Sequence, residues 1–554
     1  MNIELQPTNF NLIAGALGTF LCLYGSLSYL VKERFYMNEA PLAVLAGIGL
    51  ERLAQLLRST VDPNDDAGLR DDLDSIGNNL SRLVLGIQLV LVGIQLPHKY
   101  LRNEVKSLSI LLTLVMGTTW LITAGLLMAI IPNLSLLPAL IIASCATPTD
   151  PVLSNALVKG SFADKHVSPW LRNLILAESG ANDGFGYPFL FLALNLLKSD
   201  NAGKGLLSWF VDTCIYQVGL GAVFGIIVGV AANRILRFST RHDYIDKEGF
   251  LCYGIAVGIF TTGLGGYLDL DDLFSAFVAG NALTWDDWYR RETEDEELYN
   301  VTDLLLNSAF FLFLGATIPW SSFVQMAQEG VTVWRLIILG IAVLLLRRLP
   351  GLVVFHRLMP RLRGAFGDAV FMGYFGPIGA GAIFYMTLVI EQLQDQKENE
   401  SVKRVLTLIT PITYALIISS LLGHSSLIPF VGTYLDRRSA KEAVKLQGEE
   451  ESLRGRNDVI AHDTLEPEAH TQSTSHHPES QPPMGERSSS SNRRITRRPS
   501  QTPSQEGAFD YRKHWKDHAS WRHSTSHAPY DESDHPSDFA NSRRHVRPEE
   551  EQES

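Results

Sequence analysis

The sequence predicts an all-α integral membrane protein with about 12 or 13 transmembrane helices and a disordered C-terminal tail. Up to Tyr434, long apolar runs alternate with short polar loops, whereas almost every later position is polar. The mean hydropathy of +0.07 is therefore an average over a very apolar body and a hydrophilic tail. We expect residues 1–434 to form a transmembrane domain and residues 435–554 to form a cytoplasmic regulatory tail.

A helix needs about 20 apolar residues to cross a bilayer, and that length sets the expected spans. They are 11–31, 40–56, 80–97, 107–131, 135–156, 171–197, 212–236, 249–267, 271–286, 301–320, 331–355, 366–391 and 405–430. The ranges 40–56 and 271–286 are short or interrupted by polar residues, which leaves a count of about 12 open. The first range follows a start without basic residues, so we expect a retained signal anchor rather than a cleaved signal peptide.

Basic residues in the loops orient these spans, because Lys and Arg concentrate on the cytoplasmic side of membrane proteins. With the N-terminus outside, the cytoplasmic loops collect most of the basic residues that lie between spans. Among them are Lys32, Arg34, Lys99, Lys159, Lys165, Arg237, Arg290, Arg291 and Arg357. The segments 52–82 and 392–404 are exceptions on the outer side. The balance predicts an outside N-terminus and a cytoplasmic C-terminus.

The segment ATPTDPVLS places a carboxylate between two prolines inside a span. Pro148 and Pro151 each remove a backbone donor and disfavour helix just before them, so we expect a break at mid-membrane. The freed carbonyls and the hydroxyls of Thr147 and Thr149 are oxygen ligands that suit a small hard cation. Asp150 would then face the positive end of the second half-helix. A simple proline kink with a locally hydrogen-bonded Asp150 is the alternative.

The segment LILAESGANDGFG carries four polar side chains on adjacent helix faces. The helical period places Ser179 and Asp183 on one face, and Glu178 and Asn182 on the next. Burial disfavours the charged form of a carboxylate, whereas a bound cation restores it. Such a site can hold either a proton or a metal cation, and competition between them is itself an exchange mechanism. A polar cluster that only packs helices together is the alternative.

Two arginines lie well within a later apolar segment, AVLLLRRLPGLVV. A buried charge is normally paired, so Arg347 or Arg348 could lie opposite Glu178. The alternative is that both side chains extend to the membrane interface.

A second interrupted span occurs in GYFGPIGAGAIFY, around Gly376 and Pro377. Paired interrupted helices in corresponding halves of a chain are typical of an inverted-repeat transporter with its site at the repeat interface. Asp271 and Asp272, in GYLDLDDLFS, fall at an outer helix end. They could collect cations there, although an ordinary acidic helix cap is the alternative.

These segments resemble the fungal plasma-membrane Na+/H+ antiporters of the monovalent cation/proton antiporter superfamily. The resemblance covers about residues 10–435 and includes AVLAGIGL, IQLVLVGIQLP, YLDLDDLFSAFVAGNA and the long run ATPTDPVLSNALVKGSFADKHVSPWLRNLILAESGANDGFGYPF. It implies a homodimer of subunits with the inverted-repeat antiporter fold, in which two broken helices cross.

The resemblance also implies roles for individual residues. Asp183 resembles the essential carboxylate that binds the cation or the proton. The further implied ligands of Na+ or Li+ are Ser179, Thr149 and Asp150. The residues implied to stabilise the site are Glu178 and Asn182, together with Arg348, which fits the family's arginine position through RLPG.

We therefore expect a transporter, not an enzyme, that exports Na+ or Li+ in exchange for H+ by alternating access, with K+ as a further candidate cation. The expected location is the plasma membrane, and the partners of the tail are left open. No cofactor and no nucleic-acid partner are expected. A cation channel is the main alternative, but channels usually build a symmetric filter from rings of groups. An intramembrane aspartyl protease would need a Gly-x-Gly-Asp pattern that this sequence lacks.

Overall fold

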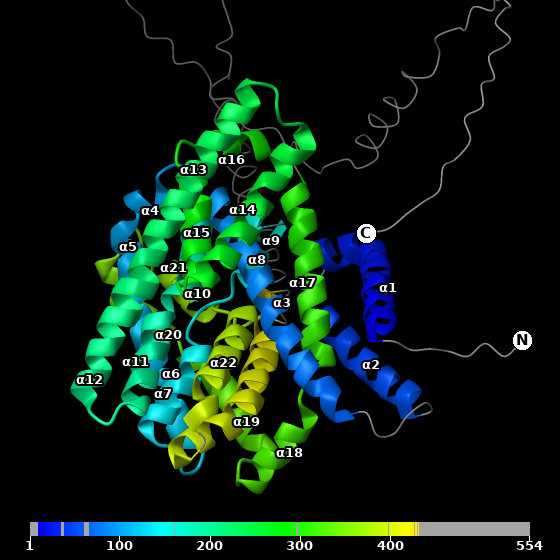
Figure 1. Ribbon diagram of the computed structural model, residues 1–554, viewed down its shortest axis with the longest axis vertical. Helices are drawn as coiled ribbons and strands as arrows, with labels where there is room; N and C mark the ends of the chain where they lie inside the picture. Colours follow the sequence, from blue (N-terminus) through cyan, green and yellow to red (C-terminus); the bar gives the residue numbers. More distant parts are fainter. Residues whose placement is uncertain are drawn as a thin grey trace, which may run out of the picture. The chain divides into compact units, whose positions relative to one another are not determined.

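The computed structural model describes residues 9–34, 38–59, 66–159, 161–294, 297–396, 398–425, 427–428 and 430–431. Within these ranges every regular element is helical, as the sequence predicts (Figure 1). The expected tail, residues 435–554, lies outside the described residues.

The first half of the described chain forms α1 (Asn9–Tyr29), α2 (Ala40–Ser59), α3 (Asp66–Gln95), α4 (Tyr100–Asn103), α5 (Val105–Ile110), α6 (Met116–Ile130), α7 (Leu136–Cys145), α8 (Pro151–Val158), α9 (Ser161–His166), α10 (Pro169–Phe185) and α11 (Tyr187–Lys198). The second half forms α12 (Ala202–Ser208), α13 (Gly221–Arg241), α14 (Lys247–Tyr267), α15 (Asp272–Leu283), α16 (Trp288–Thr293), α17 (Leu298–Ala316), α18 (Trp320–Gln328), α19 (Val333–Leu346), α20 (Leu349–Phe355), α21 (Phe366–Tyr374) and α22 (Ala380–Leu393). A last helix covers Glu400–Ser425. A segment of π-helix at Leu30–Arg34 extends α1. Two others, at Leu111–Val115 and Trp209–Leu220, join α5 to α6 and α12 to α13.

Seven helical stretches in the described ranges are long and apolar enough to cross a membrane. They are Ala14–Lys32, Val105–Ile130, Ala202–Arg241, Lys247–Tyr267, Leu298–Ala316, Val333–Leu358 and Glu400–Ser425. Shorter apolar helices cover Asn79–Gln95, Leu136–Cys145 and Asp272–Leu283. Each predicted span falls on one or more of the observed helices, so the chain is a multi-pass membrane protein.

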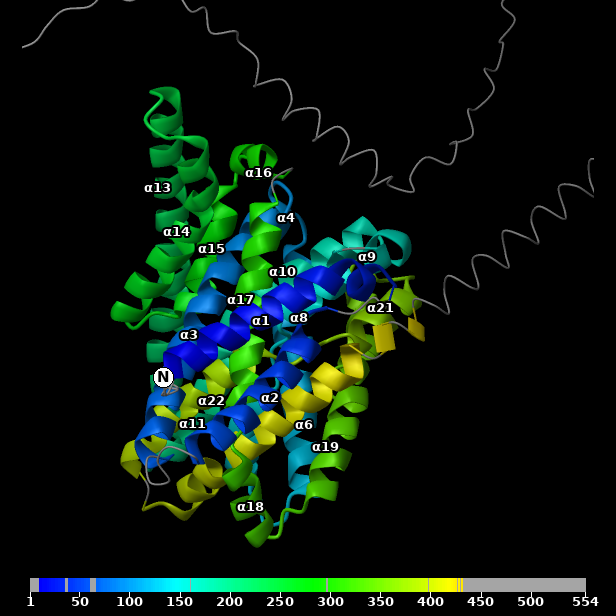
Figure 2. The same ribbon diagram turned by 90° about the vertical axis from the view of Figure 1, so that its right-hand side faces the viewer.

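The helices pack into two groups. In the first, which we call the α3 bundle, α3 packs against α14, α15 and α17, while α13 packs on α15 and α2 packs on α17 (Figures 1 and 2). In the second, the α10 bundle, α8 packs on α10, α7 packs on α6, α11 and α22, and α20 packs on α21. The last helix joins the α10 bundle, because Ser420 Oγ accepts a hydrogen bond of 2.7 Å from Ile378 N. The bundles meet where α10 and α22 touch α3.

Glycines let helices of the α3 bundle approach to backbone contact. A Cβ atom on Gly93 of α3 would lie 2.5 Å from the Phe277 carbonyl of α15, and one on Gly280 of α15 would collide with the Val90 carbonyl of α3. Small residues at helix interfaces are a common way to pack membrane helices. The α3 bundle is therefore held by close contacts that any larger side chain would disrupt.

Two polar contacts join the bundles at opposite ends of α17. Lys159, directly after α8, lies 3.3 Å from the Asp303 carboxylate near the start of α17. Thr317, directly after α17, shares a hydrogen bond of 3.3 Å with the Tyr414 hydroxyl of the last helix. The helix thus touches the α10 bundle through a polar group at each end.

Both predicted helix breaks are present. Residues 146–150 separate α7 from α8, and residues 375–379 separate α21 from α22. Two further interruptions were not predicted, at Gly186 between α10 and α11 and at residues 347–348 between α19 and α20. Pro188 and Pro350, each at the second residue of the following helix, were the available signals.

Candidate functional site

Asp150 joins the two breaks. Its Oδ1 accepts a hydrogen bond of 2.9 Å from Leu153 N in the first turn of α8, and its Oδ2 accepts one from Ala380 N in the first turn of α22. Its own backbone N donates to the Pro377 carbonyl at 2.9 Å. Helix N-termini carry partial positive charge, so one carboxylate neutralises two half-helix ends at the same point.

Asp183 lies beside this point, in α10, and is fully buried. In the part of the chain that the structure describes, neither of its carboxylate oxygens has a hydrogen-bond partner. Its Oδ1 faces the first turn of α22, where a Cβ atom on Gly381 would lie only 2.7 Å away. The Tyr385 hydroxyl fixes the backbone nearby by donating to the Asp183 carbonyl at 2.6 Å. A buried carboxylate without hydrogen-bond partners is unstable in its charged form, so a proton or a bound cation would stabilise Asp183.

A row of hydroxyls connects the first break to α10. Asn182 Nδ2 donates to Thr149 Oγ1 at 2.7 Å, and Asn182 Oδ1 accepts from Thr149 N at 3.3 Å. Thr149 Oγ1 lies 3.4 Å from Ser179 Oγ, which donates to Ser154 Oγ at 3.2 Å. All four side chains are buried. Three buried hydroxyl oxygens therefore form a connected row that includes Ser179, one helical turn before Asp183 in α10.

The two adjacent arginines have different partners. Arg348 Nη2 donates to Glu178 Oε2 at 2.5 Å, so the structure brings these two residues together. Arg347 donates instead to the Ala146 carbonyl at the end of α7 and to the Gly376 carbonyl after α21. Both side chains are buried and neither extends to an interface. Arg347 thus places a positive charge at the negative, carbonyl ends of two half-helices. Asp150 does the reverse, because it places a negative charge at two positive N-terminal ends.

The remaining residues of the breaks contribute less directly. The Thr147 hydroxyl donates to the Ala143 carbonyl of the preceding helix, α7, at 2.8 Å and is not part of the hydroxyl row. Gly376 and Pro377 contribute backbone carbonyls, which accept the bonds described above.

Asp271 and Asp272 lie at the start of α15 and are fully buried. Asp271 Oδ1 accepts from Phe274 N at 2.9 Å, which is the helix cap given as the alternative to cation collection. Asp272 Oδ2 pairs with Arg82 Nε of α3 at 2.6 Å. The sequence indicated neither this ion pair nor the depth at which it lies.

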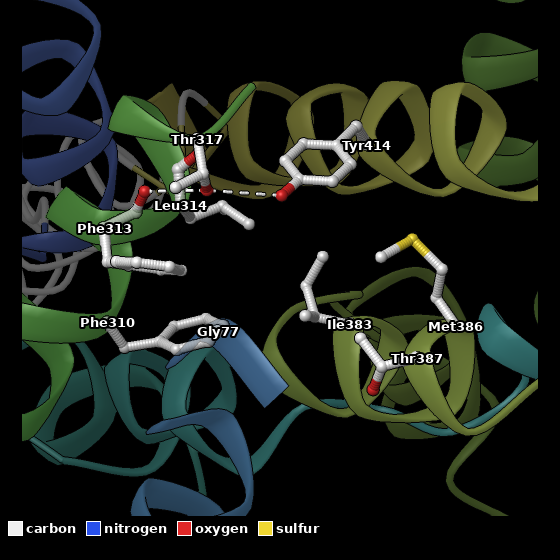
Figure 3. Close-up of a pocket in the computed structure, with 9 residues that line it drawn as sticks. All are labelled: Gly77, Phe310, Phe313, Leu314, Thr317, Ile383, Met386, Thr387 and Tyr414. Atoms are coloured by element: carbon white, nitrogen blue, oxygen red, sulfur yellow. Dashed lines mark hydrogen bonds between the residues drawn. The ribbon is translucent and has the colours of Figure 1, made fainter. Parts of the chain in front are cut away.

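A small pocket lies between the two bundles (Figure 3). It is lined by Gly77, Phe310, Phe313, Leu314, Thr317, Ile383, Met386, Thr387 and Tyr414. The hydrogen bond between Thr317 and Tyr414 crosses one side of it. None of the site residues expected from the sequence lines this pocket.

The profile of a family described as "Sodium/hydrogen exchanger, transmembrane" matches residues 18–432. The chain belongs to the sodium/hydrogen exchanger family.

Similar members of the exchanger family come from yeasts. A probable Na+/H+ antiporter of Schizosaccharomyces pombe is 34% identical over 440 residues, which cover 77% of this chain and 56% of that protein. The Na+/H+ antiporter of Saccharomyces cerevisiae is 34% identical over 443 residues, covering 77% of this chain and 44% of that protein. The chain thus spans about half the length of these relatives. A second Na+/H+ antiporter of Schizosaccharomyces pombe is 30% identical over 453 residues, covering 79% of this chain and 94% of that protein.

The fold of this chain also matches a solved structure. The sodium proton antiporter MjNhaP1 from Methanocaldococcus jannaschii aligns with a TM-score of 0.55 and 20% identity, over 77% of this chain and 98% of that one. The predicted antiporter fold and the resemblance to the monovalent cation/proton antiporter superfamily are both confirmed.

Two residues of the polar centre are not indicated by the sequence alone. Ser154 lies one helical turn after Asp150, the residue before α8, and this spacing is the available signal for it. The sequence offers Arg347 two roles, as a partner for Glu178 or as a side chain that extends to the interface, and the structure shows neither. Its contacts with two broken helices depend on the crossing of segments far apart in the chain.

Proposed function

We propose that this protein exchanges Na+ or Li+ for H+ across the membrane by alternating access, with the cation and the proton competing for Asp183. K+ is a further candidate cation. The observation that carries the proposal is the burial of Asp183 without a hydrogen-bond partner among the described residues. The relatives' names, which are those of Na+/H+ antiporters, support the choice of ions.

In the proposed cycle, Asp183 carries either a proton or a cation through the barrier, because a bare carboxylate is costly at membrane depth. A bound Na+ or Li+ would be shared by the Asp183 carboxylate and the hydroxyls of Ser179 and Thr149. Asp150 would add negative charge from the crossing of the half-helices. Two broken helices that supply backbone and side-chain oxygens are typical of transporter sites.

The remaining buried polar groups would hold the site in shape. We assign Asn182 to the orientation of Thr149, which it contacts through both ends of its amide. We assign Glu178 and Arg348 to the stability of the bundle, since each charge is the other's buried partner. We assign Asp271 to the cap of α15 and Asp272 to the ion pair with Arg82, rather than to the attraction of cations.

We further propose a plasma-membrane homodimer with an outside N-terminus and a cytoplasmic C-terminus. The charge bias of the loops supports this orientation. Residues 1–434 would form the exchanger domain and residues 435–554 the cytoplasmic tail.

The test is transport by the full chain reconstituted into lipid vesicles that contain a pH-sensitive dye. An imposed Na+ or Li+ gradient should drive proton movement in the opposite direction at clamped membrane potential. Cation flux without obligatory proton movement would instead identify a channel and overturn the proposal.

A further inference from the structure

The hydroxyl row next to Asp183 has a direction. Asn182 donates to Thr149 Oγ1, and Ser179 donates its single hydroxyl hydrogen to Ser154 Oγ. Ser179 therefore has no hydrogen left for Thr149, so the contact of 3.4 Å between them is donated by Thr149. The hydrogens therefore follow one order along the row, from Asn182 through Thr149 and Ser179 to Ser154.

The direction of the hydrogen bonds determines which oxygen lone pairs are available to a cation. A hydroxyl binds a cation through an oxygen lone pair, and a serine hydroxyl has two lone pairs and one hydrogen. In the observed row, Ser179 accepts one hydrogen bond and donates one, which leaves one lone pair for a ligand. Thr149 also keeps one lone pair for a ligand, because it accepts from Asn182 and donates to Ser179.

We propose that Ser154 is a positioning residue for cation binding, because it accepts the Ser179 hydrogen and so keeps the Ser179 oxygen available to the ion. This inference rests on the proposed exchange at Asp183. Ser154 lies in the first turns of α8, only 1% exposed, and its backbone N donates to the Asp150 carbonyl at 3.1 Å. The hydrogen bond to Asp150 at the start of α8 therefore also fixes the position of the Ser154 hydroxyl.

Removal of the Ser154 oxygen would give the Ser179 hydrogen another acceptor. Asp183 lies one turn further along the same face of α10, and both of its oxygens lack protein partners among the described residues. A Ser179 hydroxyl turned toward that carboxylate would occupy the place of the cation. Cation binding would then have to break a hydrogen bond that the wild-type site does not contain.

The experiment measures the KM for Na+ and for Li+, and the maximal rate, in vesicles that contain the full chain. Ser154→Ala should raise both KM values about tenfold, as expected for one hydrogen bond, with less than a twofold change in the maximal rate. Ser154→Thr, which keeps the acceptor, should return the KM values toward the wild type. Ser154→Cys has a weaker acceptor of similar size, so its KM values should lie between those of the wild type and Ser154→Ala. This variant replaces Ser154→Ala in the experiment if the alanine variant fails to fold.

A double-variant cycle separates positioning from simple packing. If Ser154 acts through Ser179, Ser154→Ala should add no further KM increase in a Ser179→Ala background. Ser144→Ala is the matched control, because Ser144 is equally buried in α7 but donates to the Ile141 carbonyl of its own helix. Its KM values should stay within twofold of the wild type.

An unchanged KM in Ser154→Ala, or additive effects in the double variant, would overturn the inference while leaving wild-type exchange intact. Absence of cation-driven proton movement in the wild type would overturn the proposed function instead.

Discussion

Arg348 donates to Glu178 across 2.5 Å, and neither side chain is more than 7% exposed. Each charge is buried only because the other is present, since removing one partner of a buried pair leaves an uncompensated charge. The pair joins α10, which carries Asp183, to the junction of α19 and α20. Its loss should therefore affect stability more than the chemistry of ion binding.

Arg348→Ala should destabilise the folded protein by about 3–5 kcal/mol, because Glu178 would remain buried without its partner. Thermal unfolding in detergent is the measurement. Replacing both residues together, as Glu178→Met with Arg348→Met, should cost less than Arg348→Ala alone. An unfolding temperature unchanged in Arg348→Ala would contradict the importance of the pair.

Asp183→Asn should abolish exchange without unfolding the protein, because an amide has nearly the same shape but cannot alternate between a proton and a cation. Vesicle transport measures the loss of exchange, and size-exclusion chromatography checks that the variant remains folded. Asp164→Asn is the control, since Asp164 is a surface carboxylate, 66% exposed, that pairs with Arg172. Cation-driven proton flux that persists in Asp183→Asn would rule out Asp183 as the exchanging group.

Gly381→Ala should impair transport, because the new methyl group would lie 2.7 Å from Asp183 Oδ1 and displace it. The expected change is at least tenfold in the KM for Na+. Gly263→Ala is the matched control, because a Cβ atom at Gly263 of α14 meets nothing within 4 Å. That substitution should be neutral or should stabilise the helix by up to about 1 kcal/mol. Equal transport in the two variants would show that Asp183 has room to move.

Lys159 and Asp303 should be energetically coupled, although by only about 0.5–1 kcal/mol, because the Lys159 side chain is 33% exposed and solvent screens the pair. Alanine variants at each position, and together, give the coupling from unfolding in detergent. If the two bundles move against each other during transport, breaking the pair should also change the turnover rate. Additive single effects and an unchanged rate would count against both expectations.

Asp287 provides a pH test away from the membrane centre. Hydrogen bonds from Arg290 and Arg291, with their charges, hold the pKa of this carboxyl below its usual value. A lowered folded-state pKa gives a stabilising contribution that is complete above the unfolded pKa and is lost as the pH falls through the folded value. The stability difference between the wild type and Asp287→Asn should therefore shrink below about pH 4. Thermal unfolding of both proteins across that pH range is the measurement. A stability difference that stayed constant as the pH fell would refute the prediction.

Local chemistry made the helix breaks predictable. Pro148 and Pro151 cannot continue a helix, and Gly376 and Pro377 have the same effect in the second break. The helical period alone also predicted that Ser179 and Asp183 share one face of α10. These inferences needed only neighbours along the chain.

Contacts between distant segments could not be derived in the same way. Arg347 and Arg348 are adjacent, and only the packing of α10 against the α19–α20 junction decides which of them reaches Glu178. The depth of Asp272 and its pairing with Arg82 depend on how α15 lies on α3. Ser154 was missed for a similar reason, because its relation to Ser179 depends on the register between α8 and α10.

The two polar contacts at the ends of α17 also constrain the length of that helix. Asp303 and Thr317 are separated by nearly four turns, so both face the α10 bundle from one side of the helix. One inserted or deleted residue between them would turn one end by about 100° relative to the other, and only one contact could then form. Substitutions along the exposed side of α17, which carries Val301 and Leu305, are therefore easier to accommodate than any change in its number of residues.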